Sequence, residues 1–343
     1  MKTRRINLAL QGGGAHGAFT WGVLDRLLED ESIEIAAISG TSAGALNGAA
    51  LKAGLVTGGA DGARANLDWL WSTVGSLGSA LPSAWMTLFT PGTLANSLEN
   101  SPAYAVLEAG AGLFGPYDSG PLYTNPLRPI VERFRYDAVC AEPGPPLHIC
   151  ATNVRSGKIR VFSGDGIGVD PILASACLPT LFRAVEIHDP ETGREEAYWD
   201  GGYTGNPALY PLFAASLPPD IVVVNINPLH REELPRTRRQ IENRINEIGF
   251  NTSLLRELRA IAFVQRLLEE GTVPADRMKE VFVHMIADDA LMNELSVATK
   301  VIALPVVLDA LKAAGRVAAG AFLDDHGDKL GHESSIDLQA MFT

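Results

Sequence analysis

Two apolar runs near the N-terminus each lead through a turn of very small residues into a helical pattern. Residues 6–11, INLALQ, have the length and composition of a buried strand, and an apolar helical face follows at residues 16–30. Residues 33–40, IEIAAISG, repeat the strand pattern ahead of a small-residue helix at 41–54. Because two successive βα units place their strands parallel in one sheet, we expect an α/β fold with a mainly parallel central sheet.

The alternation of strands and helices continues along the chain after a change of composition at residues 56–125. That segment is rich in Gly, Ser and Pro with scattered large apolar residues, which indicates an insertion over one edge of the sheet. Further helices are predicted at 125–134 and 170–178, and further strands at 146–154, 159–164, 196–203 and 220–228. From residue 231 the pattern is charged and helical, with one strand-like run at 280–287.

Composition excludes several classes of protein. The formal net charge of −12 argues against general nucleic-acid binding. Every long apolar stretch contains charged residues, so no membrane-spanning helix is predicted. Cys140, Cys150 and Cys177 form neither a CxxC pair nor an even disulfide set, and are expected to be small buried side chains. With no membrane span and no disulfide set, we expect a cytoplasmic protein. The sequence shows no metal-ligand cluster, so we expect that it needs no metal.

The glycine-rich turn after the first strand fits two different functions. Gly12, Gly14 and Gly17 have the spacing of a dinucleotide-binding fingerprint. Alternatively, the backbone N–H groups of Gly12, Gly13 and Gly14 could stabilise a developing oxyanion. A dinucleotide site requires an acidic residue at the end of the second strand, whereas Glu34 lies at the start of that strand. The oxyanion interpretation is therefore favoured, and nucleotide binding is the weakest alternative.

The turn after the second strand carries a serine in a G-x-S-x-G pattern, Gly40-Thr41-Ser42-Ala43-Gly44. A sharp turn between strand and helix exposes such a serine and requires small neighbours. The helix that follows directs the positive end of its dipole toward charge that develops beside the serine. We therefore predict that Ser42 is a nucleophile, and that the N–H of Ala43 is a further oxyanion donor.

The candidate base for Ser42 is an aspartate. YWDGGY places Asp200 at a strand end, followed by Gly201 and Gly202, which permit a tight turn. A partly desolvated carboxylate has a raised pKa and can accept a serine proton directly. The downstream histidines lie in no sharp motif; His188, for example, is expected in a charged turn.

Three motifs in this order, GGGAHG, GTSAG and DGG, resemble the patatin-like phospholipase family, and SACLPTLF at 175–182 resembles a further segment of it. The resemblance covers about residues 6–228. It implies a three-layer α/β/α core, a Ser42–Asp200 dyad without histidine, an oxyanion loop at Gly12–Gly14, and hydrolysis of lipid acyl esters. We expect residues 1–230 to form the catalytic α/β domain, with 56–125 as a candidate lid. Residues 231–343 then form a helical C-terminal extension packed on the core.

One position departs from the family pattern. The position of His16 is usually Arg or Lys in the family, and a permanent cation there would help to bind an anion. Histidine is charged only below about pH 6.5 unless its pKa is shifted. His16 is therefore either neutral and structural, which we favour, or a source of pH dependence.

The sequence thus predicts a serine hydrolase that cleaves carboxylic esters of phospholipids, lysophospholipids or related lipids through an acyl-enzyme, without a cofactor. The expected partners are a lipid or acyl-ester substrate and a lipid surface contacted peripherally, and not nucleic acid. One alternative is a general carboxylesterase or thioesterase that acts on soluble acyl substrates. Another is a non-catalytic protein that binds a lipid surface.

Overall fold

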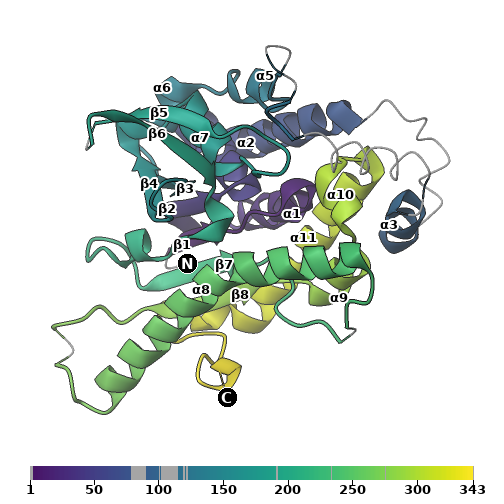
Figure 1. The fold of residues 1–343 in the computed structure, drawn as a ribbon. Helices are drawn as coiled ribbons and strands as arrows, with labels where there is room; N and C mark the ends of the chain where they lie inside the picture. The colour runs from purple at the N-terminus through teal and green to yellow at the C-terminus, as the bar shows by residue number, and fades with distance from the viewer. Residues whose placement is uncertain are drawn as a thin grey trace.

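An eight-stranded sheet forms the centre of the protein (Figure 1). The computed structural model describes residues 3–78, 90–99, 101, 115–118, 120, 123–190, 192–232, 234–274 and 276–342. The strands are β1 (Arg4–Leu10), β2 (Ile33–Thr41), β3 (Leu147–Asn153), β4 (Ile159–Ser163), β5 (Val185–Asp189), β6 (Arg194–Asp200), β7 (Asp220–Val224) and β8 (Phe282–Ile286). Their order is β5-β6-β3-β2-β1-β7-β8, and β4 also pairs with β3.

Most of the sheet is parallel, as the two N-terminal βα units predict. The contiguous strands β3, β2, β1, β7 and β8 all pair in parallel, whereas β4, β5 and β6 are antiparallel additions on one side. The carboxyl ends of β1 and β2 are neighbours, because Leu10 pairs with Gly40. The turns that follow these two strands therefore emerge together, which is where open α/β sheets build their sites.

The edge of β3 brings a third strand end to the same place. Strand β4 pairs with one edge of β3. Strands β2 and β6 both pair with the opposite edge, β2 with the first residues of β3 and β6 with the last. Thr41 at the end of β2 pairs with Cys150, and Asp200 at the end of β6 pairs with the next residue, Ala151. This register places Asp200 beside the residue that follows Thr41, which is Ser42.

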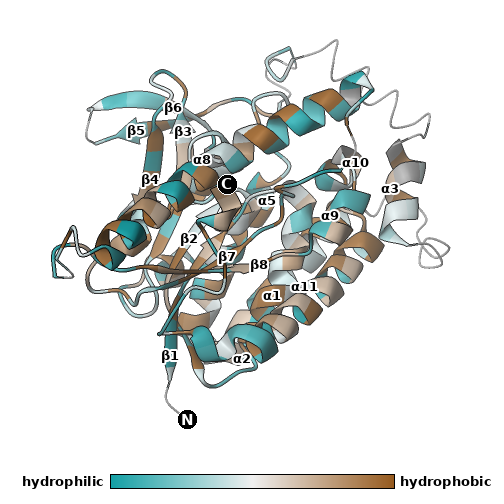
Figure 2. Cartoon of the chain, turned by 90° about the horizontal axis from the view of Figure 1, so that it is seen from below, coloured by the Kyte–Doolittle hydropathy of each residue, from teal (hydrophilic) through white to brown (hydrophobic). Residues whose placement is uncertain are grey.

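Helices cover both faces of the sheet, which confirms the expected three-layer α/β/α fold. The helices are α1 (Gly17–Leu27), α2 (Ala43–Gly78), α3 (Pro91–Glu99), α5 (Arg128–Val131), α6 (Tyr136–Val139), α7 (Val169–Ser175), α8 (Arg238–Glu269), α9 (Asp289–Glu294), α10 (Val297–Val301) and α11 (Pro305–His326). Figure 2 shows α1 and α11 on one side of the sheet and α8 on the other. The side chains of β1 alternate between the two faces: Leu8 and Leu10 face the α1 side, and Ala9 faces the α8 side.

The C-terminal region is helical, as expected, but it is also part of the same sheet. Strand β8 pairs in parallel with β7, at the run predicted as strand-like. Helix α11 packs along α1, while α8 covers the opposite face. Residues after 230 therefore contribute to all three layers.

Helix α2 extends well beyond the predicted end at residue 54 and is folded back on itself. Gly58 and Gly59 have non-helical backbone angles, and the second half of α2 returns beside the first. Side-chain hydrogen bonds tie the two halves together, from Trp71 Nε1 to Asn47 Oδ1 (2.9 Å) and from Asn66 Nδ2 to the carbonyl of Ala50 (3.2 Å). Residues 60–78, within the segment predicted as an insertion, thus form a packed helix.

Most of the remaining candidate lid lies outside the described residues. This applies to several of its large apolar residues, which are Trp85, Met86, Leu88, Phe89, Leu113 and Phe114. Elsewhere, one strand was missed by the sequence analysis. His188 lies within β5, which pairs with β6, and not in a charged turn. The alternation of charged and apolar side chains in VEIHD belongs to an antiparallel hairpin with a solvated face.

Candidate active site

Ser42 occupies a strained turn between β2 and α2. Its φ is 55°, and among the described residues it is the only non-glycine residue with a positive φ. A side chain on Gly44 would place its Cβ 2.1 Å from the carbonyl oxygen of Leu10, so the turn packs directly against β1. The Ser42 N–H donates to Ser175 Oγ (2.8 Å) at the end of α7. These contacts hold the Ser42 hydroxyl at the surface of a pocket, in the geometry of a nucleophile elbow.

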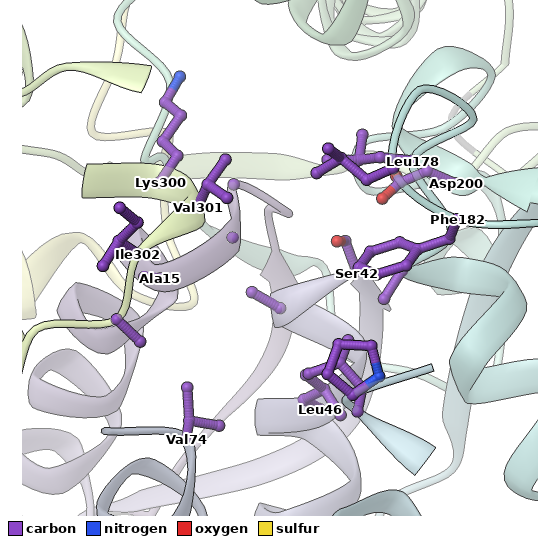
Figure 3. Close-up of a pocket in the computed structure, with 18 of the residues that line it drawn as sticks. Ala15, Ser42, Leu46, Val74, Leu178, Phe182, Asp200, Lys300, Val301 and Ile302 are labelled. Atoms are coloured by element: carbon purple, nitrogen blue, oxygen red, sulfur yellow. The ribbon is translucent and has the colours of Figure 1, made fainter. Parts of the chain in front are cut away.

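Asp200 lies beside Ser42 and is almost completely buried. Its Oδ1 accepts the N–H of Gly202 (2.7 Å), while Oδ2 is buried without a regular hydrogen-bond partner among the described residues. Figure 3 shows the Ser42 hydroxyl and the Asp200 carboxyl pointing toward each other. Burial raises the pKa of Asp200 to about 7, against the opposing effects of the Gly202 N–H and the Ser42 hydroxyl.

The contact between Ser42 and Asp200 is looser than a regular hydrogen bond. The Ser42 hydroxyl lowers the Asp200 pKa as a hydrogen-bond donor does, yet Oδ2 has no partner at regular geometry. Such contacts commonly tighten only when a substrate is bound. A carboxyl group with a pKa near 7 that faces a hydroxyl can take a proton from it at neutral pH.

The glycine turn after β1 divides into two parts. Gly13, Gly14 and Ala43 line the same pocket as Ser42, so they remain candidates for the oxyanion donors. Gly12 lies behind them, and its N–H donates to Asn206 Oδ1 (2.7 Å). A Cβ on Gly12 would be 2.6 Å from the Cβ of Ser42. Gly12 therefore permits the close approach of two turns. The sequence analysis proposed its N–H as an oxyanion donor, but this N–H is already bonded to Asn206.

Four buried side-chain amides fix the position of the glycine turn. Asn227 Nδ2 donates to the Gly12 carbonyl (2.7 Å), and Gln11 Oε1 accepts the Asn227 N–H (3.1 Å). Gln11 Nε2 contacts Asn251 Oδ1 (3.4 Å), and Asn251 donates to the Pro228 carbonyl (3.1 Å). With Asn206, these amides join the ends of β1 and β7 to α8. Because such a network is buried and largely satisfied, it holds the turn rigidly.

The pocket beside Ser42 has a volume of about 380 Å³ and is largely apolar. Its apolar wall comes from both halves of α2, from the segment after α7 and from α10. The apolar residues are Ala15, Ala43, Leu46, Leu70, Trp71, Val74, Leu77, Pro126, Leu127, Ala176, Leu178, Leu181, Phe182, Phe250, Val301, Ile302 and Ala303. A cavity of this size and lining suits an acyl chain.

The described residues that line the pocket include no histidine, and they include the charged residues Asp200, Glu247 and Lys300. His16, on the glycine turn, is buried, and its Nε2 contacts Thr299 Oγ1 (2.9 Å). Burial, and then the positive charge of Lys300, hold the His16 pKa well below its usual value. His16 is therefore neutral and structural at physiological pH, which is the interpretation that the sequence analysis favours. In the described part of the chain, no group of three or more His, Cys, Asp or Glu residues is placed to bind a metal.

Several residues of the site were missed by the sequence analysis. Asn227 follows a buried parallel strand next to β1, so a rule that polar residues gather at strand ends could have indicated it. Asn251 and Lys300 carry no such signal, because only tertiary packing brings α8 and α10 to the glycine turn.

Known proteins that are similar to this chain include one protein family and several solved structures. The family model described as patatin-like phospholipase matches residues 8–213, which is more than half of the 343-residue chain. Among solved structures, the chain is similar to VipD from Legionella pneumophila, with 15% sequence identity and a TM-score of 0.38 over 99% of this chain and 72% of VipD. No curated protein matches the chain significantly. None of the described helices is both long enough and apolar enough to cross a bilayer.

Proposed function

The chain belongs to the patatin-like phospholipase family, a family of lipid acyl hydrolases, and we propose that it cleaves carboxylic esters of phospholipids, lysophospholipids or related lipids through a Ser42–Asp200 dyad. One observation carries this proposal: the residue in the strained turn faces a buried carboxyl group of raised pKa at the end of an apolar pocket. Each of these features serves a step of acyl transfer.

In the first half of the proposed reaction, Ser42 Oγ attacks the acyl carbonyl carbon and its proton passes to Asp200. The carbonyl oxygen becomes an oxyanion, which the N–H groups of Gly13, Gly14 and Ala43 stabilise. When the tetrahedral intermediate collapses, the bond to the alcohol breaks and Asp200 returns the proton to the departing alkoxide. An acyl ester on Ser42 remains.

In the second half, a water molecule attacks the acyl carbon and gives a proton to Asp200. The second intermediate collapses with cleavage of the bond to Ser42 Oγ, which takes that proton back from Asp200. The products are a fatty acid and the alcohol part of the lipid. Since Asp200 must be ionised to begin each half, its raised pKa sets the pH range of activity.

The proposal is tested by hydrolysis assays on the full chain with a p-nitrophenyl ester series, a phospholipid and a lysophospholipid. Ser42→Ala and Asp200→Asn should each abolish hydrolysis while circular dichroism shows that the variants remain folded. Ser156→Ala, in an exposed turn, and Asp165→Asn, in an exposed 3-10 helix, are the matched controls and should retain full activity. Activity that survives Ser42→Ala would refute the nucleophile, and hydrolysis of soluble esters alone would favour a general esterase. A folded wild type that hydrolyses nothing and ignores a fluorophosphonate would favour a lipid-binding protein.

We also propose that residues 1–230 form the catalytic domain and that the extension at 231–343 completes the pocket. The rim of the pocket includes two apolar residues that are well exposed, Leu77 (52%) and Val301 (46%). Contact of this rim with a lipid surface would let a lipid pass into the pocket without crossing water. Co-sedimentation with phosphatidylcholine vesicles should weaken in a Leu77→Asp/Val301→Asp double variant; unchanged binding of the folded variant would contradict this contact.

A further inference from the structure

A basic cluster from the C-terminal region borders the candidate active site. It consists of Arg231, Arg244 and Lys300, which share one carboxylate, Glu247. Lys300 and Glu247 line the pocket. Figure 3 shows Lys300 across the pocket from Leu178.

Lys300 is held against the glycine turn by its backbone. Gly14 has a φ of +60°, and a Cβ there would be 2.3 Å from the Lys300 carbonyl oxygen. The residue before Lys300 is fixed to the same loop, because Thr299 Oγ1 contacts His16 Nε2 at 2.9 Å. The Lys300 side chain therefore starts beside the proposed oxyanion donors, and its position is coupled to theirs.

The three basic side chains of the cluster meet at one buried carboxylate. The Glu247 side chain is 1% exposed and contacts Arg231 Nη2 (2.7 Å), Lys300 Nζ (3.3 Å) and Arg244 Nη1 (3.4 Å). Although burial opposes ionisation, Arg231 and Lys300 lower the Glu247 pKa to about 2, so this group is a carboxylate. Burial lowers the pKa of Lys300, whereas the Glu247 carboxylate raises it and so favours the charged ammonium form.

Lys300 is the member of the cluster that can reach a ligand. Its ammonium group has three N–H donors, of which the contact with Glu247 uses one. Its side chain is largely shielded from water, with 17% exposed, which strengthens its attraction for an anion in the pocket. The neutral His16 supplies no charge to the same turn.

We propose that Lys300 binds the phosphate of the lipid substrate and so selects phosphate-bearing acyl esters over neutral acylglycerols. This inference rests on the proposed function, because it assigns the substrate class of the same pocket. The acyl chain occupies the apolar wall, the ester carbonyl lies at Ser42, and the phosphate lies at Lys300. A phosphate group matches the site because it offers several charged acceptor oxygens to an ammonium group.

The test compares lysophosphatidylglycerol with a monoacylglycerol of the same acyl chain, both below their critical micelle concentrations. Wild type should prefer the lysophospholipid, and this preference should fall as salt is added. Lys300→Met should lower kcat/KM for the lysophospholipid about 10–100-fold, mainly through KM, and leave the monoacylglycerol within about threefold. Lys300→Arg should retain most of the preference. Lys312→Met, which removes an ion-paired lysine of α11 outside the pocket, is the matched control and should change neither value.

Three outcomes would overturn the proposal. One is a wild type without preference for the phosphate-bearing substrate, which needs no variant to fold. The second is an equal loss on both substrates in Lys300→Met, which would make Lys300 a structural partner of Glu247. The third is that inorganic phosphate inhibits both reactions equally and that Lys300→Met does not change the preference. Lys300 would then bind free phosphate and not the phosphate of the lipid. If wild type hydrolyses neither substrate and Ser42 reacts with no fluorophosphonate, the proposed function itself fails.

Discussion

Two carboxyl groups, that of Asp200 at the end of β6 and that of Glu257 on α8, have similarly raised pKa values and different surroundings. Asp200 and Glu257 both have pKa values of about 7, and in both cases burial is the main cause. Glu257, on α8, accepts the backbone N–H groups of Leu209 and Tyr210, both at 2.8 Å. Asp200 instead lines the pocket and faces the hydroxyl of Ser42. A raised pKa therefore reports burial, and the neighbouring hydroxyl and the access to a pocket are what mark Asp200 as a candidate base.

The largest expected difference between the two groups is in activity. Asp200→Asn removes the proposed proton acceptor and should lower kcat/KM for p-nitrophenyl butyrate by about 10³-fold or more. Glu257→Gln keeps an oxygen that can accept the two N–H groups and should stay within about threefold of wild type. A comparable loss in both variants, with both folded, would remove the distinction between the two groups.

The pH profile sharpens the comparison, because either group could titrate near pH 7. Asp200 must be ionised to act as a base, so activity should rise with pH through about 7 and fall about tenfold per pH unit below it. Glu257→Gln should leave this inflection unchanged when kcat/KM is measured from pH 5 to 9. An inflection that moves or disappears in Glu257→Gln would mean that Glu257 controls the reaction.

The smallest expected effect is on stability, where the two groups should behave alike. Each has a folded-state pKa above its unfolded value, so ionisation destabilises the fold progressively between about pH 4 and 7. Asp200→Asn should therefore raise the free energy of unfolding at pH 8 by up to about 4 kcal/mol, and Glu257→Gln by somewhat less. Urea denaturation at pH 8 and pH 4 measures this. A gain that persists at pH 4 would show that the effect is not ionisation.

Sequence alone predicts the parts of the site that local patterns specify. Ser42 directly follows β2 and Asp200 ends β6, each within a short motif of small residues, and a turn at the end of a strand fixes where the side chain emerges. Their proximity depends on the order of strands, since β2 and β6 meet only through β3. The family resemblance implies the Ser42–Asp200 dyad and hence their proximity, which the periodicity of the strands does not.

The parts that depend on distant contacts were not predictable. Gly12 fits an oxyanion loop as a sequence, but its N–H is taken by Asn206, which is 194 positions away. Lys300 reaches the pocket because α10 packs on Gly14, and no motif surrounds it. The second half of α2 was not predicted as a helix, because its glycines suggest a loop. Tertiary packing of residues 60–78 nevertheless maintains a helix. Long-range packing thus decides which polar groups are free to react.

The most direct test of the Ser42–Asp200 dyad is the rate at which a fluorophosphonate labels Ser42 as a function of pH, followed by peptide mass spectrometry. The dyad predicts one adduct, on the peptide that contains Ser42, with a rate that rises through about pH 7 in wild type and in Glu257→Gln. Labelling should be lost in Asp200→Asn. An adduct on another residue, or labelling of Ser42 in Asp200→Asn at the wild-type rate, would contradict the dyad.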